Sequence, residues 1–370
     1  MRVGILGGGQ LGRMLALAAA PLGHECVIFA QSGDEPACAV ARSVLGAFDD
    51  DDALARFAGS VDVVTYEFEN VPLAAVEGLA AHVPVRPGAR SLVVASDRVH
   101  EKTTFRELGI ATAPFRAVDD EASLREAVRA IGLPAVLKTR RLGYDGKGQR
   151  VLRTEADLDG ALASLGSVPS ILEGFVSFQR ELSILGVRAL DGTIATYPLV
   201  ENVHRDGILF RTTAPAPHVS APLADEARAA IASLLTELDH VGVLALELFD
   251  RDGALLANEI APRVHNTGHF SIEGAHTSQF EAHIRAITGD PLASTALRGH
   301  SVMINLVGAI PARASLLALP HAHTHLYGKA PRPGRKVGHV TINADDPETV
   351  RTETSDVIAI VAQARDILAG

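Results

Sequence analysis

The chain is poor in tryptophan, cysteine and aromatic side chains: its 370 residues include no Trp and two Cys, and Phe, Trp and Tyr together make up 4%. Cys26 and Cys38 are too few for a disulfide framework and are not spaced as a metal site. No apolar run reaches the roughly 18 residues that span a bilayer, and the first residues do not follow a signal-peptide pattern. We therefore expect a protein of the reducing cytoplasm with no membrane partner.

Basic residues are also scarce relative to acidic ones. The chain has 34 Lys and Arg against 44 Asp and Glu, a formal net charge of −10. This balance argues against a nucleic-acid partner, although a local basic patch can still bind a small phosphorylated ligand. Apolar residues make up 47% and charged residues 21%, which is typical of a globular protein, and the length predicts two or three domains.

The N-terminal residues predict a doubly wound, Rossmann-like domain. A strand at 3–6 is followed by the glycine-rich turn 7–12, a helix and a second strand at 26–30. The turn satisfies the dinucleotide pattern, but Ala30-Gln31 stands where that fold needs an acidic residue for the ribose. A nicotinamide-dependent oxidoreductase is therefore a weak alternative. The glycines either only permit a tight turn or, together with Gln10, border a different ligand.

Two acidic residues follow the next buried-type strand, at 61–66. Glu67 and Glu69 come where the strands of such a sheet end, the edge at which doubly wound folds bind ligands. Asn70 precedes Val71-Pro72 and is typical of a helix N-cap. We expect one of the two carboxylates on the ligand and Asn70 as the cap. The acidic run 49–52 predicts the start of another helix.

The centre of the chain carries a lysine followed by a glycine-rich loop. The apolar strand 135–137 leads to Lys138, and another strand begins at 150. Glycine allows backbone N–H groups to approach an anion closely, and a lysine beside them can act as a point charge on a phosphate. The alternative is a flexible hairpin tip with solvated charges. The loop comprises Gly143, Tyr144, Asp145, Gly146, Lys147, Gly148 and Gln149.

The elements around this loop predict a small α+β lid. Asp97 is expected to cap a helix at 98–108, on which Arg98 and Lys102 share one face and would repel each other unless an anion lies near. A solvated basic face is the alternative. Helices at 121–131 and 155–165 and a strand at 170–172 complete the unit. Residues 173–176, where the chain leaves that strand, could supply backbone hydrogen bonds to an adenine, and Glu181 could bind ribose hydroxyls.

The pair Glu247 and Glu259 is the most diagnostic feature. Strands at 243–249 and 254–260 flank hairpin-turn residues, and a loop centred on Gly253 would place the two glutamates opposite each other with Cβ atoms about 5 Å apart. Like charges so placed are destabilising without a cation. Hard oxygen ligands favour Mg²⁺ or Mn²⁺ bridged to substrate phosphates. The alternative is one protonated or solvent-facing glutamate.

Polar residues continue beyond this hairpin and return near the C-terminus. Arg263 could reach an anion at the metal, and Asn266 offers hydrogen bonds in the same loop. After a helix at 279–287, short strands and loops are expected. Basic residues without an intervening acid predict a phosphomonoester site. They are Lys329, Arg332, Arg335 and Lys336. The alternating His321, His323 and His325 could bind a metal, but a surface loop or partly buried histidines are favoured.

Taken together, these motifs resemble the ATP-grasp ligases and, among them, the N5-carboxyaminoimidazole ribonucleotide synthetase family of purine biosynthesis. The stretches that carry the resemblance are 7–14, 66–72, 138–149, 259–269 and 332–339. It implies a mixed α/β and α+β ATP-grasp fold. The implied domains are a Rossmann-like domain at 1–96, an ATP-grasp domain at 97–297 with a lid at about 112–172, and a small β-rich domain at 298–370.

The resemblance also implies the reaction and the residues that perform it. ATP, bicarbonate and 5-aminoimidazole ribonucleotide would give the N5-carboxylated ribonucleotide, ADP and phosphate through carboxyphosphate. The catalytic residues would be Arg263, Lys138 and Asp145. ATP would be held by Arg98, Lys138, the loop from Gly143 to Gln149, Glu173, Gly174, Phe175, Val176, Glu181, His204, Asn258 and Glu259. The ribonucleotide would contact Gln10, Glu67, Tyr144, Asp145, Lys147, Asn266, Lys329, Arg335 and Lys336. Glu247 and Glu259 would bind Mg²⁺ or Mn²⁺.

The same resemblance implies a homodimer that binds small-molecule substrates and no nucleic acid. The nearest alternative is another ATP-grasp enzyme, such as formate-dependent glycinamide ribonucleotide transformylase or biotin carboxylase. A non-catalytic nucleotide-binding subunit is a third possibility, against which the intact Glu247 and Glu259 pair argues.

Overall fold

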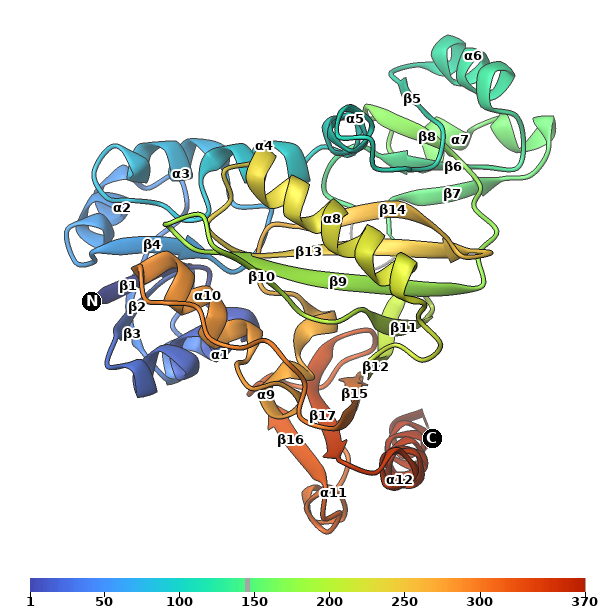
Figure 1. Ribbon diagram of the computed structural model, residues 1–370. Coiled ribbons are helices and arrows are strands. Elements are labelled where there is room, and N and C mark those ends of the chain that lie inside the picture. The colour runs from blue at the N-terminus through green and yellow to red at the C-terminus, as the bar shows by residue number, and fades with distance from the viewer. Residues whose placement is uncertain (144–146, 370) are drawn as a thin grey trace.

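A computed structural model describes residues 1–143 and 147–369, the last five without their side chains. Three sheets organise the chain: a parallel sheet near the N-terminus, a small antiparallel sheet and a large central sheet (Figure 1). Among the described residues, no helix is long and apolar enough to cross a membrane.

The N-terminal sheet is parallel, in the strand order β3-β2-β1-β4. Its strands are β1 (Arg2–Leu6), β2 (Glu25–Ala30), β3 (Arg42–Leu45) and β4 (Val63–Tyr66), and its helices are α1 (Gln10–Ala19), α2 (Asp51–Ala58), α3 (Leu73–Ala80) and α4 (Ala89–Ala95), with short 3₁₀ turns η1 (Ala20–Leu22) and η2 (Pro36–Ala39). Strands alternate with helices and pair in parallel around β1, so the Rossmann-like prediction is confirmed.

Two predicted helix starts in this domain have different outcomes. Asp50 caps α2 by accepting a hydrogen bond from the backbone of Ala53, as the acidic run predicted. The prediction that Asn70 caps the following helix is wrong: α3 begins at Leu73 after Pro72, and the cap has no side-chain hydrogen bond. Proline lacks an N–H and has a fixed φ, so the helix can start behind it without a polar cap.

The small antiparallel sheet forms the lid, with the strand order β5-β8-β6-β7. Its elements are β5 (Phe115–Val118), α6 (Glu121–Ile131), β6 (Ala135–Thr139), β7 (Gln149–Leu152), η3 (Glu155–Leu158), α7 (Ala161–Ser164) and β8 (Ser170–Gly174). The continuous helix expected at 155–165 is wrong, because Gly160 adopts a left-handed conformation with φ 68° and separates η3 from α7. Strand β8 also runs further than expected and includes Glu173.

The central sheet has nine strands and crosses residue 297, where we expected a domain boundary. Strand β12 pairs with β15, so the C-terminal strands extend the ATP-grasp sheet in the order β14-β13-β9-β11-β12-β15-β17-β16, with β10 beside β9. The strands are β9 (Arg180–Arg188), β10 (Ile194–Thr196), β11 (Val200–Arg205), β12 (Ile208–Ala214), β13 (Gly242–Arg251), β14 (Ala254–Ala261), β15 (His300–Val307), β16 (Ala322–Leu326) and β17 (Lys336–Ala344).

Helices cover this sheet and close the C-terminal part. They are α5 (Arg98–Glu107), α8 (Ala221–Glu237), η4 (Asn266–Gly268), α9 (Ser271–Gly274), α10 (Gln279–Thr288), α11 (Arg313–Leu317) and α12 (Pro347–Ala369). The 23-residue α12 was not predicted, and it buries Val350, Val357 and Val361 in the core of β15 and β17. Its apolar positions are diluted by polar residues, which hides the helix in the sequence.

The N-terminal domain and the central sheet share one hydrophobic core. Ile5 and Leu15 from the first domain pack in the same buried cluster as Val243 and Ile284. At the edge of this core two buried histidines bridge the domains. We call the group of His283, Thr65, His240, Ser91 and Val243 the seam.

Candidate active site

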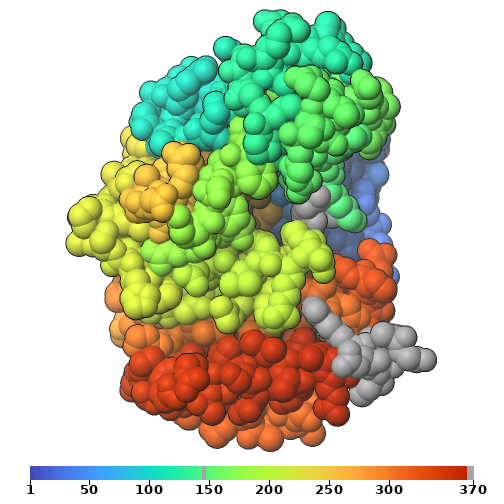
Figure 2. All heavy atoms as spheres, turned by 90° about the vertical axis from the view of Figure 1, so that its right-hand side faces the viewer, coloured from blue at the N-terminus to red at the C-terminus, as the bar shows by residue number. Residues whose placement is uncertain are grey.

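A cavity of about 390 Å³ lies between the lid sheet, the central sheet and the N-terminal domain. Figure 2 shows the molecule hollowed on this face, with the lid above and strands β11 and β12 below. Many predicted site residues line it: Gln10, Arg98, Lys138, Gly143, Lys147, Gln149, Glu181, His204, Glu247, Asn258, Glu259, Arg263, Asn266 and Lys336.

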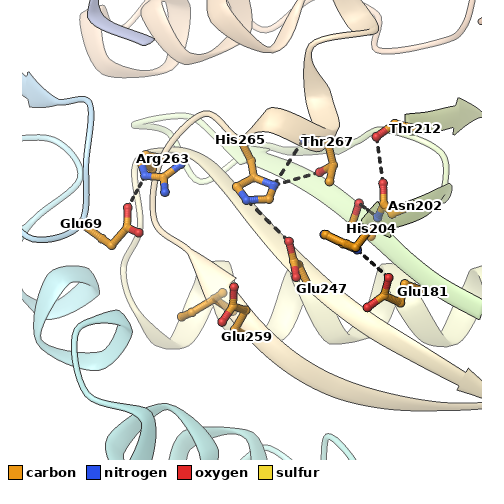
Figure 3. Close-up of polar contacts among 12 residues, drawn as sticks. Glu69, Glu181, Asn202, His204, Thr212, Glu247, Glu259, Arg263, His265 and Thr267 are labelled. Atoms are coloured by element: carbon orange, nitrogen blue, oxygen red, sulfur yellow. Dashed lines mark hydrogen bonds and ion pairs between the residues drawn. The ribbon is translucent and has the colours of Figure 1, made fainter. Parts of the chain in front are cut away.

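The hairpin of β13 and β14 places Glu247 directly opposite Glu259, as predicted (Figure 3). The predicted turn is wrong. The connection is two residues, Asp252 and Gly253, both with positive φ (55° and 81°), which is the tight turn favoured between twisted strands. A β-bulge at Asn258 then shifts the register by one residue, so the two glutamates still face each other.

The two facing carboxylates differ electrostatically. Burial and the charge of Glu259 raise the pKa of Glu247 to about 8. Glu259 is also desolvated, but Arg98 donates a hydrogen bond to it at 2.9 Å and lowers its pKa. One carboxylate is thus held ionised by an arginine, while burial and the neighbouring charge disfavour ionisation of the other.

The donor set fits a hard divalent cation. Two carboxylates plus phosphate oxygens are the usual ligands of Mg²⁺ in nucleotide enzymes. Asn258 Oδ1, next in the chain to Glu259, is buried and has no hydrogen-bond partner among the described residues. In that same part of the chain, no group of three or more His, Cys, Asp or Glu side chains is arranged to hold a metal. The two facing carboxylates that would hold Mg²⁺ are Glu247 and Glu259.

Helix α5 brings Arg98 and Glu101 to this wall and Lys102 behind it. Asp97 caps the helix by accepting from Val99 N at 3.0 Å, as predicted. The solvated basic face is wrong, because Lys102 is buried and its anion belongs to the protein: Glu173 lies 3.4 Å from its Nζ. Glu101 is buried beside it and accepts from Ile260 N at 2.6 Å.

Lys138 meets the same carboxylate. Its Nζ donates to Glu173 Oε2 at 3.0 Å, and it also lines the cavity. Burial alone would raise the pKa of Glu173, but Lys102 and Lys138 lower it to about 2. The lysine that we predicted to bind a phosphate is therefore paired with a buried carboxylate of the protein.

The predicted ribose-binding acid is also paired. Glu181 Oε2 lies 2.5 Å from His204 Nδ1, on neighbouring strands of the central sheet (Figure 3). Burial would lower the pKa of His204, but the hydrogen bond to Glu181 and its charge raise it. These two residues line one wall of the cavity, and the family resemblance assigned both of them to ATP.

The loop after β14 connects the hairpin to the N-terminal domain. Arg263, which we predicted to reach an anion, forms an ion pair with Glu69, one of the two carboxylates of which we expected one on the ligand (Figure 3). Burial would raise the pKa of Glu69, but Arg263 lowers it to about 2. Asn266 lines the cavity, and both its side-chain polar atoms are buried without a partner among the described residues. An amide in this state is available to a ligand.

The second predicted acid of the N-terminal domain, Glu67, is engaged within the protein. It accepts hydrogen bonds from the backbone of Gly9 and Gly12, the latter at 2.8 Å. Its carboxylate thereby satisfies free N–H groups in the first turn of α1. Burial raises the pKa of Glu67. Gln10, in the same turn, accepts a hydrogen bond from Lys329, which brings the C-terminal basic segment to the N-terminal domain.

Two of the three alternating histidines, His321 just before β16 and His325 within it, have partners within the protein. His321 Nδ1 and His325 Nε2 each lie 2.7 Å from a carboxylate oxygen, of Glu353 and Glu273 respectively. These contacts match the favoured prediction of partly buried histidines.

Models of three known domain families match this chain in order. They are the ribonucleotide synthetase preATP-grasp domain (residues 1–96), the ATP-grasp domain (103–280) and the phosphoribosylaminoimidazole carboxylase C-terminal domain (301–353). The chain is 51% identical over 361 residues to N5-carboxyaminoimidazole ribonucleotide synthase of Pseudomonas aeruginosa, covering 98% of this chain and 99% of that one. The chain belongs to the N5-carboxyaminoimidazole ribonucleotide synthase family.

Solved structures agree with this assignment. N5-carboxyaminoimidazole ribonucleotide synthetase from Thermus thermophilus superimposes with a TM-score of 0.94 at 50% identity, covering 97% of this chain and 98% of that one. N5-carboxyaminoimidazole synthase from Aspergillus clavatus, in complex with ADP and 5-aminoimidazole ribonucleotide, gives 0.91 at 32% identity, with 98% of each chain covered. The predicted ATP-grasp fold and the resemblance to this synthase family are therefore confirmed.

Some residues that the family resemblance assigned do not line the cavity. Glu67, Gly148, Glu173, Gly174, Phe175, Val176, Lys329 and Arg335 are outside its lining. Phe175 is 48% exposed beyond the end of β8. Tyr144, Asp145 and Gly146, expected in the glycine loop, lie outside the described residues.

The synthase cavity also contains residues that sequence reasoning missed. His265 lines it with its Nε2 3.6 Å from Glu247, and burial lowers the pKa of this histidine to about 3 (Figure 3). Arg140 and Arg141 line it as well, and both are bound to Asp97. The sequence signal for these three residues was that His265 lies in the same motif as Arg263, and Arg140 and Arg141 in the same motif as Lys138.

Proposed function

We propose that this chain carboxylates 5-aminoimidazole ribonucleotide with ATP and bicarbonate, through carboxyphosphate, to give N5-carboxyaminoimidazole ribonucleotide, ADP and phosphate. The observation that carries the proposal is the facing pair Glu247 and Glu259 at the wall of a cavity that all three sheets approach. The family of the chain supports the same reaction.

Positive charge surrounds the place where phosphoryl transfer would occur. Arg98 is already bound to Glu259, and Lys138 lines the cavity from the lid. Phosphoryl transfer needs alignment and charge neutralisation more than covalent chemistry. When bound at Glu247 and Glu259, Mg²⁺ would neutralise phosphate oxygens and polarise the transferred group. The protein's own share is to hold the two glutamates in register through the bulge at Asn258.

Bicarbonate is a poor electrophile and would therefore be activated as carboxyphosphate. Because carboxyphosphate decomposes in water, the site must exclude water. Arg263, held in place by Glu69, offers a fixed guanidinium at the cavity wall for an anion. The lid sheet lies above this wall (Figure 2). Closure of the lid before chemistry would protect the water-sensitive intermediate.

The ribonucleotide would lie against the N-terminal domain and the C-terminal basic segment. Gln10 and Lys329 are joined by a hydrogen bond there, and Lys336 and Asn266 line the cavity nearby. These groups offer hydrogen bonds and positive charge to a phosphomonoester. The aromatic amine of the substrate needs orientation more than a strong base, so no nucleophile of the enzyme itself is required.

Three further properties belong to this proposal. We expect a homodimer, a location in the reducing cytoplasm, and domains divided in the chain at about residues 96 and 297, although β15 after the second division pairs with β12 before it. Light scattering after size exclusion tests the first, cell fractionation the second and limited proteolysis the third.

The decisive experiment is the substrate dependence of ADP release. We expect ADP release to require both bicarbonate and 5-aminoimidazole ribonucleotide, with N5-carboxylated product formed in equal amount. Omission of bicarbonate is the matched control. Stimulation by glycinamide ribonucleotide with formate, and none by aminoimidazole ribonucleotide with bicarbonate, would show that the chain is a different ATP-grasp enzyme.

A further inference from the structure

Three side chains on one face of α5 hold the segment of β14 that contains Glu259. Arg98, Glu101 and Lys102 are spaced i, i+3 and i+4 and therefore point the same way. Glu101 accepts from Ile260 N at 2.6 Å, immediately after Glu259. Lys102 donates to the carbonyl of Asn258 at 2.7 Å, immediately before it.

These contacts provide hydrogen bonds to backbone groups at the edge of the central sheet. Strand β14 is the edge strand of the central sheet, and on its outer side it meets residues 111–112 in an isolated bridge at Ala257. The bulge at Asn258 further interrupts the ladder. Buried backbone groups require hydrogen bonds. The carbonyl of Asn258 accepts one from Lys102 at 2.7 Å, and that of Ala257 accepts from Thr112 Oγ1 at 2.8 Å and from Lys102 at 3.3 Å. The position of Glu259 therefore depends on α5.

Lys102 has a second partner, in the lid. Its Nζ is 3.4 Å from Glu173 Oε2, the same oxygen to which Lys138 donates at 3.0 Å. Lys102 and Glu173 are almost fully buried, with side chains 1% and 5% exposed, whereas the Lys138 side chain reaches the cavity and is 13% exposed. One carboxylate thus has two counter-ions, of which one is fixed by backbone carbonyls and the other faces the ligand site.

We propose that Lys102 is a positioning residue: it keeps the Glu173 carboxylate neutralised when Lys138 turns from it to a phosphate of ATP. The inference rests on the proposed function, in which Lys138 binds ATP. A buried ion whose partner leaves is strongly destabilised. Without Lys102, Glu173 would therefore retain Lys138 and oppose nucleotide binding.

The test is the ATP affinity of Lys102→Met, measured by calorimetry without the ribonucleotide on variants whose thermal unfolding stays cooperative. We expect the dissociation constant for ATP to rise at least about tenfold, whereas the KM for the ribonucleotide changes far less. Arg106→Met, which removes a cation from the last turn of the same helix, is the matched control and should bind ATP as the parent does.

A double variant separates positioning from packing. In Lys102→Met with Glu173→Gln, no carboxylate remains to hold Lys138, so we expect ATP affinity to recover relative to Lys102→Met alone. A merely structural role for Lys102 predicts no recovery. If Lys102→Met alone does not fold, the double variant, which removes the buried Lys102 and Glu173 charges together, is compared with Glu173→Gln: equal ATP affinity supports the proposal, and a further loss overturns it.

Failure of this inference is distinguishable from failure of the proposed function. If the parent chain binds ATP and carboxylates aminoimidazole ribonucleotide, but folded Lys102→Met binds ATP equally well, the role of Lys102 is overturned and the reaction stands. If the parent chain does not bind ATP, the proposed function fails first.

Discussion

The cavity wall and the seam both bury polar groups, but they treat them in opposite ways. At the seam each ring nitrogen has a partner: His283 Nδ1 accepts from Val243 N at 3.0 Å, and its Nε2 is 2.8 Å from the Thr65 hydroxyl. His240 is bonded at both nitrogens as well, to Ser91 and to the carbonyl of Val243.

At the cavity wall, by contrast, polar groups remain unsatisfied or in conflict. Glu247 faces Glu259, and the side-chain oxygens of Asn258 and Asn266 are buried without partners among the described residues. Satisfied buried polar groups stabilise one arrangement, whereas unsatisfied ones reduce stability until a ligand completes them. The difference teaches that the seam serves folding and the wall serves binding, and mutations should separate the two effects.

The largest expected effect is at the wall. Glu247→Gln should lower the rate of ADP formation at least about 10²-fold, because it removes a metal ligand and with it the charge neutralisation of the phosphates. The same change should raise the free energy of unfolding of the metal-free protein at pH 8, since it removes the repulsion from Glu259. Steady-state kinetics and urea unfolding measure the two outcomes.

The matched control for this variant is Glu226→Gln on the exposed face of α8. It should change neither the rate nor the free energy of unfolding beyond about 0.5 kcal/mol. Loss of stability together with activity in Glu247→Gln would contradict the contrast, because it would place this glutamate among the residues that stabilise the fold.

The seam should respond in the reverse way. His283→Leu leaves Val243 N–H and the Thr65 hydroxyl without partners in the core, so we expect the free energy of unfolding to fall by about 2–3 kcal/mol. Well below its melting temperature the variant should keep a kcat within about twofold of that of the parent, because the seam residues do not line the substrate cavity. A twofold change in kcat corresponds to about 0.4 kcal/mol in the activation barrier. Urea unfolding and the ADP assay measure the two quantities.

Exposed His276, shortly before α10, provides the control for His283. His276→Leu should change the free energy of unfolding by no more than about 0.5 kcal/mol. If His283→Leu lost catalytic activity in proportion to its stability, the seam would share the role of the cavity wall and the comparison would fail.

The metal hairpin shows how far sequence reasoning reaches. The pairing of Glu247 with Glu259 was predicted correctly, but from a turn centred on Gly253 that the structure does not have. Two deviations from the assumed hairpin cancel in the pairing register. The turn is one residue shorter than assumed, and the bulge at Asn258 adds one residue to β14, so Glu247 again faces Glu259. Turn residues are a local sequence signal that predicts a hairpin. A bulge depends on how the strand packs against α5 and the lid, and no local sequence pattern predicts that packing.

Long-range polar contacts were the least predictable part. The motifs identified Arg98, Lys138 and Glu259 because each belongs to a local signature. Lys102 was recognised as needing an anion, but Glu173, 71 positions away in sequence, could be named only from the fold. The seam histidines carry no local signal at all, since an isolated histidine in an apolar segment is compatible with many environments.

The smallest expected effect is a pH dependence with opposite signs in the two regions. Burial lowers the pKa of His240 from 6.5 to about 4. Between these values the unfolded chain binds a proton that the folded chain does not, so stability falls as the pH falls, by at most about 1.4 kcal/mol per pH unit from this group. His240→Gln should flatten the slope of unfolding free energy against pH, measured by urea unfolding from pH 5 to 6.5.

At the wall, the pKa of Glu247 is raised from 4.5 to about 8, so this carboxyl favours the folded state less as the pH rises through that range. Glu247→Gln should therefore make the slope steeper where His240→Gln makes it shallower. If the curves of unfolding free energy against pH for both variants ran parallel to that of the parent, neither buried group would titrate differently in the folded and unfolded chains. The contrast between wall and seam would then rest on hydrogen bonding alone.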